Sequence, residues 1–178
     1  GDTRSVENGG AFMGENKTEL VPYKNKMPAV VESGQLPDAI SAAVCRKLIR
    51  VAMEYRNRAY TPYSGFQVGA ALLTAQNEIF GGCNVENAAY SPTNCAERTA
   101  FFKAVSEGAR EFLAIAIVGG KEGELTDFCA PCGVCRQALV EFCDPKNFVV
   151  YLGTSEEDYK GYLLEELLPY SFTPKNVL

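Results

Sequence analysis

Two short stretches organise this chain: Thr93-Asn94-Cys95-Ala96-Glu97-Arg98 and Pro131-Cys132-Gly133-Val134-Cys135-Arg136. The first places a thiol two residues before a carboxylate, and the second is a Cys-x-x-Cys motif that opens with proline. A catalytic zinc ion takes three protein ligands and keeps its fourth position for water. The two stretches therefore predict a catalytic zinc site held by Cys95, Cys132 and Cys135. Glu97 is the predicted carboxylate that takes a proton from the water.

Both stretches also carry signals for the start of a helix. Asn94 is the expected N-cap of a helix over about 94–108, and Pro131 suits the entry of a helix over about 132–142. All three sulfurs would then lie at helix N-termini, where the helix dipole favours thiolate over thiol. Either Arg98 or Arg136 is a candidate hydrogen-bond donor to these sulfurs.

A structural zinc site is the main alternative for these cysteines. Such a site is closed by a fourth protein ligand, and the chain offers Cys83, Cys129 and Cys143 for that position. The carboxylate two residues after Cys95 favours the catalytic alternative, because a structural site needs no free carboxylate.

Composition narrows the class of protein. The chain has 178 residues, of which 47% are hydrophobic and 22% charged, and this suits one globular domain. Histidine is absent, which excludes Ser-His-Asp and Cys-His nucleophilic catalysis and any histidine zinc ligand. The net charge of −5, with no Lys/Arg cluster longer than a pair, favours a small uncharged substrate over a nucleic acid.

Compartment follows from what the sequence does not contain. No apolar run approaches the ~18 residues that span a bilayer, so we expect no membrane partner. No signal peptide is visible, and seven cysteines in a chain without one favour the reducing cytoplasm.

The pattern along the chain predicts one domain after an extension. Residues 1–36 lack a sustained hydrophobic period and are expected to form a flexible N-terminal extension, and 37–178 the domain. A helix is expected from Pro37 or Asp38, with an apolar face through Ile40, Val44, Leu48, Val51 and Tyr55. Expected strands are 66–73, 78–84, 112–118, 148–152 and 159–163, and the first two are expected to form a hairpin. A loop is expected over 119–131, after the third strand, and a short helix over 165–168. The alternation predicts an α/β fold, a three-layer α/β/α arrangement around a mixed five-stranded sheet.

Four motifs in this order resemble a known family. They are 66–71 (FQVGAA), 83–90 (CNVENAAY), 95–98 (CAER) and 131–137 (PCGVCRQ), and they are similar to those of cytidine deaminase of the small homotetrameric type. The resemblance runs from about residue 37 to the C-terminus. It implies a homotetramer that binds Zn²⁺ and a nucleoside substrate.

The resemblance also implies a role for each matching residue. Cys95, Cys132 and Cys135 would hold zinc, Glu97 would move protons, and Arg98 would support the ligands. The residues implied to contact substrate are Phe66 against the pyrimidine, Asn84 and Glu86 at the ribose hydroxyls, the Ala96 N–H at the base edge, and Ala88, Tyr90 and Phe172 in pockets near or across subunit boundaries.

The implied reaction is hydrolysis of cytidine and 2′-deoxycytidine to uridine and 2′-deoxyuridine with release of ammonia, a step of pyrimidine salvage. A carboxylate at Glu86 would repel a phosphate on the same sugar, so a nucleoside is favoured over a nucleotide. Two alternatives stay open: a deaminase of a cytosine-nucleoside antibiotic of the blasticidin type, and a non-catalytic zinc-stabilised interaction module.

Overall fold

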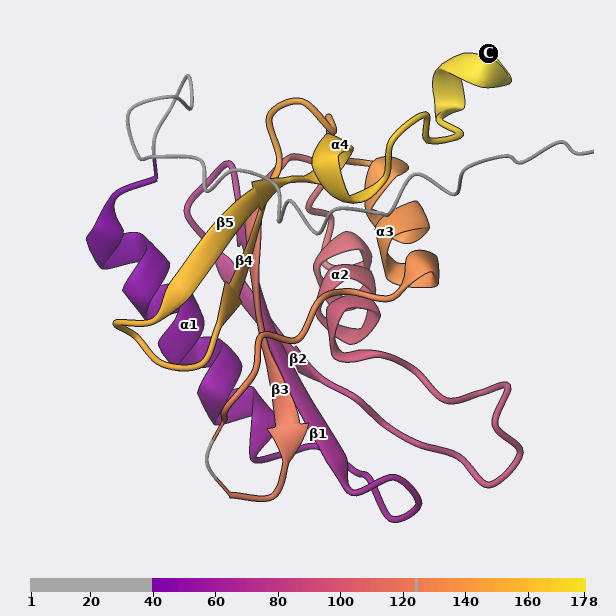
Figure 1. Cartoon of the computed structure of the whole chain (residues 1–178). Coiled ribbons are helices and arrows are strands. Elements are labelled where there is room, and N and C mark those ends of the chain that lie inside the picture. Colours follow the sequence, from indigo (N-terminus) through magenta and orange to yellow (C-terminus); the bar gives the residue numbers. More distant parts are fainter. Residues whose placement is uncertain (1–39, 124) are drawn as a thin grey trace, which may run out of the picture.

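The structure, a computed structural model, describes residues 40–123 and 125–178. The expected extension, residues 1–36, lies outside the described residues. Five strands form one sheet in the order β2-β1-β3-β4-β5, in which only the β3–β4 pair is parallel (Figure 1). The strands are β1 (Phe66–Thr74), β2 (Ile79–Cys83), β3 (Phe112–Lys121), β4 (Val149–Gly153) and β5 (Tyr159–Leu163). The mixed five-stranded sheet is confirmed.

Helices cover both faces of this sheet. They are α1 (Ala42–Arg56), α2 (Ala96–Ser106), α3 (Gly133–Val140) and α4 (Leu164–Leu167), followed by a 3₁₀ turn at Pro174–Asn176. Figure 1 shows α1 on one face and α2 with α3 on the other. Alternate residues of β1 supply the two cores, because successive side chains of a strand point to opposite faces: Ala70 and Leu72 pack toward α2 and α3, and Ala71 and Leu73 toward α1. The three-layer prediction is confirmed.

Helix α1 begins later than predicted. Its N-cap is Ser41, whose hydroxyl accepts a hydrogen bond from the Val44 N–H at 3.3 Å. Ser41 itself is extended, with ψ of 148°. Pro37 and Asp38 lie outside the described residues, but Ile40 and Ser41 are described and are not helical. The predicted helix start is therefore wrong, and the serine cap sets the start at Ala42. The predicted apolar face is otherwise present, with Leu48 fully buried.

Two glycines bring the helices against the hairpin. A Cβ atom on Gly69 would lie 1.9 Å from the Ala52 carbonyl oxygen and 2.5 Å from the Arg56 nitrogen. A Cβ atom on Gly82 would lie 2.4 Å from the Ala100 nitrogen. Such distances leave no room for a side chain, so α1 contacts β1 and α2 contacts β2 backbone to backbone. The close contact at Gly82 places the first turn of α2 directly against β2.

Strand β3 extends further than predicted, to Lys121. The added residues, Gly119 to Lys121, pair with Phe66 to Val68 at the start of β1. Two consecutive glycines are a loop signal in sequence, but here strand pairing outweighs it. The extension matters because it gives Phe66 a partner strand.

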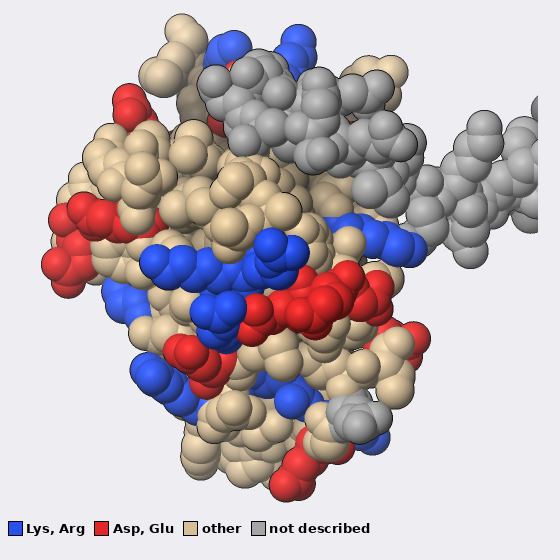
Figure 2. Space-filling view, turned by 90° about the vertical axis from the view of Figure 1, so that its left-hand side faces the viewer, with Lys and Arg blue, Asp and Glu red and all other residues tan. Residues whose placement is uncertain are grey.

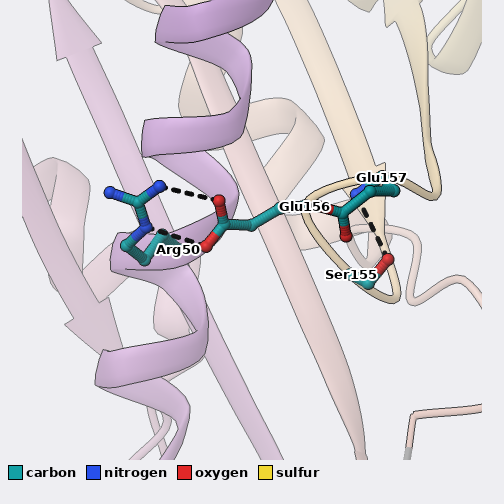
Figure 3. A network of polar contacts seen from close by, with 4 residues as sticks. All are labelled: Arg50, Ser155, Glu156 and Glu157. Carbon is teal, nitrogen blue, oxygen red and sulfur yellow. Dashed lines mark hydrogen bonds and ion pairs between the residues drawn. The ribbon is translucent and has the colours of Figure 1, made fainter.

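Charged side chains are mixed over the surface. On the face in Figure 2, basic and acidic side chains lie next to one another without forming a field of one sign. One ion pair at the surface is bidentate and joins α1 to the turn between β4 and β5. Arg50 of α1 donates from Nε and Nη2 to the two carboxylate oxygens of Glu156 in that turn, both at 2.7 Å (Figure 3). No helix in the described part of the chain is long and apolar enough to cross a bilayer.

Candidate active site

The three predicted metal-binding sulfurs lie at the N-termini of α2 and α3. Cys95 is the N-cap of α2 and Cys132 is the N-cap of α3, both with extended backbone, while Cys135 lies in the first turn of α3. Neither cap residue uses its side chain to cap the helix. Each sulfur is thus free to turn toward a common point while staying beside unpaired helix N–H groups.

The prediction that Asn94 caps α2 is wrong by one residue. Asn94 exchanges two backbone hydrogen bonds with Val85, at 2.9 and 3.0 Å, and its side-chain amide donates to the Thr99 hydroxyl at 3.2 Å. This strand-like pairing competes with a capping conformation for Asn94. Its consequence is that Cys95 takes the cap position, which brings the sulfur to the helix end.

The sulfurs form a compact group. Cys95 Sγ lies 3.8 Å from Cys132 Sγ, and Cys132 Sγ lies 3.5 Å from Cys135 Sγ. All three atoms lie within 4.8 Å of one another. No other cysteine, aspartate or glutamate of the described residues joins this group. The donor set fits a soft tetrahedral metal with one position left for a small molecule.

Arg98 is the arginine that reaches the sulfurs. Its Nη2 donates to Cys95 Sγ at 3.5 Å. Arg136 instead donates to the backbone carbonyls of Pro131 and Leu167, at 2.9 and 2.5 Å. Hydrogen bonds from Cys135 and then from Arg98 lower the pKa of the Cys95 thiol to about 5, against the opposing effect of burial. The neighbourhood therefore favours the thiolate form at Cys95.

Glu97 lies in the first turn of α2 and is only 4% exposed. Burial raises the pKa of its carboxyl group to about 7, and the charge of Cys95 adds to this. The Glu97 N–H and the Arg98 charge act in the opposite direction but do not outweigh burial. A carboxyl group with a pKa near neutral can both accept and donate a proton, which a general acid–base role requires.

The predicted sugar-binding carboxylate is held by the loop before β1. Glu86 is 8% exposed and accepts hydrogen bonds from the backbone N–H groups of Tyr63 and Ser64, at 3.0 and 3.2 Å, and from the Ser64 hydroxyl. The hydroxyl of Ser64 is the main reason that the pKa of Glu86 lies below its ordinary value. Glu86 is thereby kept ionised and in one position.

The side chain of Asn84 forms hydrogen bonds with the backbone at the start of β1. Its amide donates to the Phe66 carbonyl at 2.9 Å and its oxygen accepts from the Val68 N–H at 2.8 Å. The amide group keeps one donor and one lone pair beyond these two bonds. Asn84 therefore joins the predicted sugar contact to the strand that carries Phe66.

Val85 connects the segment that carries Asn84 and Glu86 to the sulfur group. Val85 forms bridges with Tyr60 on one side and with Asn94 on the other. Asn84 and Glu86 flank Val85, and Cys95 follows Asn94. Backbone pairing therefore sets the relative positions of the predicted sugar-contacting residues and the first sulfur.

Phe66 and Ala96 are the two residues predicted to contact the base. Phe66 is 38% exposed and lines a cavity of about 320 Å³ together with the strand end at Gly119–Lys121 and with Phe128 and Cys129. Ala96 is fully buried as the first residue of α2. Its N–H is one of the helix N-terminal donors that lack a partner within the helix.

Sequence comparison identifies the family to which this geometry belongs. The family model described as "Cytidine and deoxycytidylate deaminase zinc-binding region" matches residues 44–152. The chain belongs to the cytidine deaminase family. A cytidine deaminase of Sporosarcina psychrophila is 49% identical over 131 residues, covering 74% of this chain and 93% of the relative. A probable cytidine deaminase of Dictyostelium discoideum is 43% identical over 133 residues, covering 74% and 86%.

Solved structures of cytidine deaminases share the fold. The enzyme of Burkholderia pseudomallei superposes with a TM-score of 0.63 at 47% identity, covering 71% of this chain and 97% of that one. The enzyme of Mycobacterium tuberculosis superposes with a TM-score of 0.60 at 34% identity, covering 75% and 98%. A cytidine deaminase thus matches this chain in both sequence and architecture.

The three remaining residues implied by the deaminase resemblance lie at the surface of the single chain. Tyr90 is 78% exposed with a positive φ of 60°, Phe172 is 63% exposed, and Ala88 is exposed. The loop between β2 and α2, which carries Ala88 and Tyr90, projects away from the body of the molecule (Figure 1). Their roles stay predictions, because an exposed side chain encloses nothing by itself.

Ser64 is a residue of the candidate site that the sequence analysis did not identify. Its hydroxyl donates to Glu86, and the hydroxyl oxygen accepts from the Phe66 N–H at 3.0 Å. A hydroxyl placed two residues before a predicted aromatic contact is a weak signal. Only the fold shows that Glu86 lies beside it.

Proposed function

We propose that this protein is a zinc-dependent hydrolase that converts cytidine and 2′-deoxycytidine, with one water molecule, to uridine and 2′-deoxyuridine and ammonia. The observation that carries the proposal is the group of three sulfurs at two helix N-termini with a buried carboxyl group, Glu97, two residues from the first sulfur. Membership of the cytidine deaminase family supports the same reaction.

Cys95, Cys132 and Cys135 would hold the zinc ion. Zinc bound by three protein atoms makes a water molecule more acidic and thereby supplies the nucleophile. Three thiolates outweigh the two positive charges of zinc, and the helix N-termini and Arg98 would offset the excess negative charge. Arg98 acts on Cys95 directly, at 3.5 Å.

Glu97 would carry the protons of the reaction. It would accept a proton from water and deliver it to N3 of the cytosine ring, which makes C4 a better electrophile, and the resulting hydroxide would add to C4. Glu97 would then take the proton of the new C4 hydroxyl and deliver it to the amino group. The C4–N bond breaks, the C4 carbonyl forms, and the amino group leaves as ammonia. One carboxyl group serves both steps because it alternates between base and acid, as its raised pKa allows.

Asn84 and Glu86 would select a nucleoside. Glu86 is buried and its pKa is lowered by Ser64, so it presents a fixed negative charge to the sugar. That charge accepts hydrogen bonds from ribose hydroxyls and repels a sugar phosphate. Phe66 would pack on the pyrimidine, and the Ala96 N–H would meet the base edge.

Three exposed residues support a proposed assembly. Tyr90, Phe172 and Ala88 would complete the site across subunit boundaries in a homotetramer. We assign the deaminase domain to residues 37–178 and leave residues 1–36 outside it. A zinc site made only of thiolates suits a reducing compartment, so the cytoplasm and a place in pyrimidine salvage are part of the proposal.

The test combines metal analysis with an absorbance assay. The purified protein should contain about one zinc per chain and should remove the ultraviolet band of cytidine and of 2′-deoxycytidine. The variant Cys135→Ser should lose both the zinc and the activity. The matched control Cys143→Ser, which changes a thiol outside the sulfur group, should keep both. Zinc-loaded protein that leaves cytidine unchanged contradicts the proposal. Comparable turnover of cytidine and its monophosphate contradicts the role of Glu86.

A further inference from the structure

A buried cation lies outside the site just described. Arg56 is the last residue of α1 and is only 8% exposed. Its Nη2 donates to the backbone carbonyls of Gly120 and Lys121, at 3.3 and 2.5 Å. Its Nε is buried and has no hydrogen-bond partner among the described residues. Arginine is seldom buried without a task, because moving its charge out of water is costly.

The two carbonyls mark the end of β3, and that end supports Phe66. Lys121 pairs with Phe66 and Gly120 pairs with the next residue, Gln67. The same strand end, together with Phe66, lines the cavity of about 320 Å³. The guanidinium group therefore contacts the backbone that forms one wall of the pocket to which Phe66 contributes.

The position of Arg56 is itself tightly determined. Its backbone nitrogen would be 2.5 Å from a Cβ atom on Gly69, so α1 rests on β1 at this point. After Arg56 the chain turns to Tyr60, which exchanges backbone hydrogen bonds with Asn84 and Glu86 at 3.0 and 2.9 Å. Arg56 thus connects the end of α1 to the end of β3, which pairs with Phe66. It also lies four residues before Tyr60, which bonds to the segment that carries Asn84 and Glu86.

We propose that Arg56 is a positioning residue for substrate binding: its guanidinium group holds the end of β3 and thereby sets the place of Phe66 and the width of the adjoining cavity. This inference rests on the proposed deamination of cytidine. Arg56 lies in α1, on the opposite face of the sheet from the helices that carry the sulfurs, and acts through the backbone of β3.

The expected kinetic signature separates this role from general stability. Stacking of Phe66 on a pyrimidine contributes equally to the ground state and the transition state, and loss of such uniform binding raises KM with little change in kcat. A roughly tenfold rise in KM corresponds to a loss of about 1.4 kcal/mol in the free energy of substrate binding.

The experiment compares Arg56→Met and Arg56→Lys with Arg58→Met. Arg58 is an exposed arginine two residues away that stacks on the Tyr55 ring, 4.4 Å from its centroid. For Arg56→Met we expect a KM for cytidine raised roughly tenfold with kcat within about twofold. Zinc content should be unchanged, and amide exchange should be faster at 66–68 and 119–121 but not at 95–98. Arg56→Lys, which keeps the charge but not the fork, should be intermediate, and it serves if the methionine variant does not fold. Arg58→Met should match the parent protein.

Two outcomes overturn the inference. One is a lowered melting temperature with KM and local exchange unchanged, which makes Arg56 a stability residue only. The other is a joint loss of zinc and kcat, which places its effect at the metal. The exchange measurement does not depend on activity, so an inactive parent protein would contradict the proposed function and would still decide whether Arg56 holds the strand end.

Discussion

The sulfur group and the exposed rim of the candidate site differ in how completely one chain builds them. At the sulfur group, Cys135 and Glu97 are buried, and the three sulfurs lie within 4.8 Å of one another. At the rim, Tyr90 and Phe172 are 78% and 63% exposed. The contrast indicates that the fold of one chain assembles the sulfur group but leaves Tyr90 and Phe172 exposed. In the proposed homotetramer, a second subunit would cover them.

The largest expected effect tests the sulfur group through Glu97. Glu97→Gln keeps the size of the side chain but removes its ability to carry a proton, so kcat should fall by ~10²–10⁴-fold. Zinc content should stay at the parent level, since Glu97 does not belong to the sulfur group. The absorbance assay gives kcat, and atomic emission gives the zinc.

Glu107→Gln is the matched control for that variant. Glu107 is the exposed C-cap residue of the same helix, and its substitution should leave kcat unchanged. Turnover close to the parent level in Glu97→Gln would remove Glu97 from the mechanism.

A smaller effect is expected at Arg98, which supports the sulfur group without holding metal. Arg98→Gln removes the donor to Cys95 Sγ. Loss of such an outer partner typically weakens metal affinity by ~10–100-fold. Competition against a zinc chelator measures the change. Arg110→Gln, at an exposed arginine just beyond α2 that bonds only to backbone carbonyls, should retain zinc as the parent does. Equal zinc retention by both variants would speak against a role for Arg98.

The rim is tested by Phe172. If Phe172 covers the pocket of a neighbouring subunit, Phe172→Ala should raise KM about tenfold, because burial of an aromatic side chain is worth at least ~1.5 kcal/mol. Tyr170→Ala, at a fully exposed aromatic residue nearby, should have no such effect.

Subunit mixing makes this test specific for a shared site. Glu97→Gln and Phe172→Ala chains, unfolded and refolded together, should form some sites with both native residues. At cytidine concentrations below the raised KM, the mixture should exceed the summed activity of the separate variants. Simple addition of the two activities would confine each site to one chain.

The same contrast explains what the sequence could predict. The sulfurs, Glu97 and the alternating strands follow from local spacing, and the sheet and its two helical layers were predicted correctly. The cap at Cys95 and the extension of β3 to Lys121 were not, because each depends on pairing with a distant segment: Val85 for Asn94, and β1 for β3. The contacts of Ser64 and Arg56 were not predicted for the same reason, since their hydrogen-bond partners are 22 and 64 residues away in the chain.

The smallest expected effect concerns the hydrogen bond from the Ser64 hydroxyl to the Glu86 carboxylate. Ser64 is the main cause of the lowered pKa of Glu86. A carboxyl group whose pKa is lower in the folded state contributes stability that is fully present above its unfolded pKa, about 4.3. That contribution is lost as the pH falls through the folded pKa. Ser64→Ala should bring the folded pKa closer to the unfolded value.

The melting temperature as a function of pH measures this change. Near pH 7 the Ser64→Ala variant should be less stable than the parent, and its deficit should shrink as the pH falls below about 4, where Glu86 becomes protonated in both proteins. Ser106→Ala, which removes a hydroxyl bonded to the Lys103 carbonyl at 2.7 Å, should show a difference that does not depend on pH. A deficit of Ser64→Ala that is constant from neutral to acid pH would mean that the hydroxyl orders the loop without acting on the charge of Glu86. Glu86 would then owe its ionised state to the two backbone N–H groups of Tyr63 and Ser64 alone.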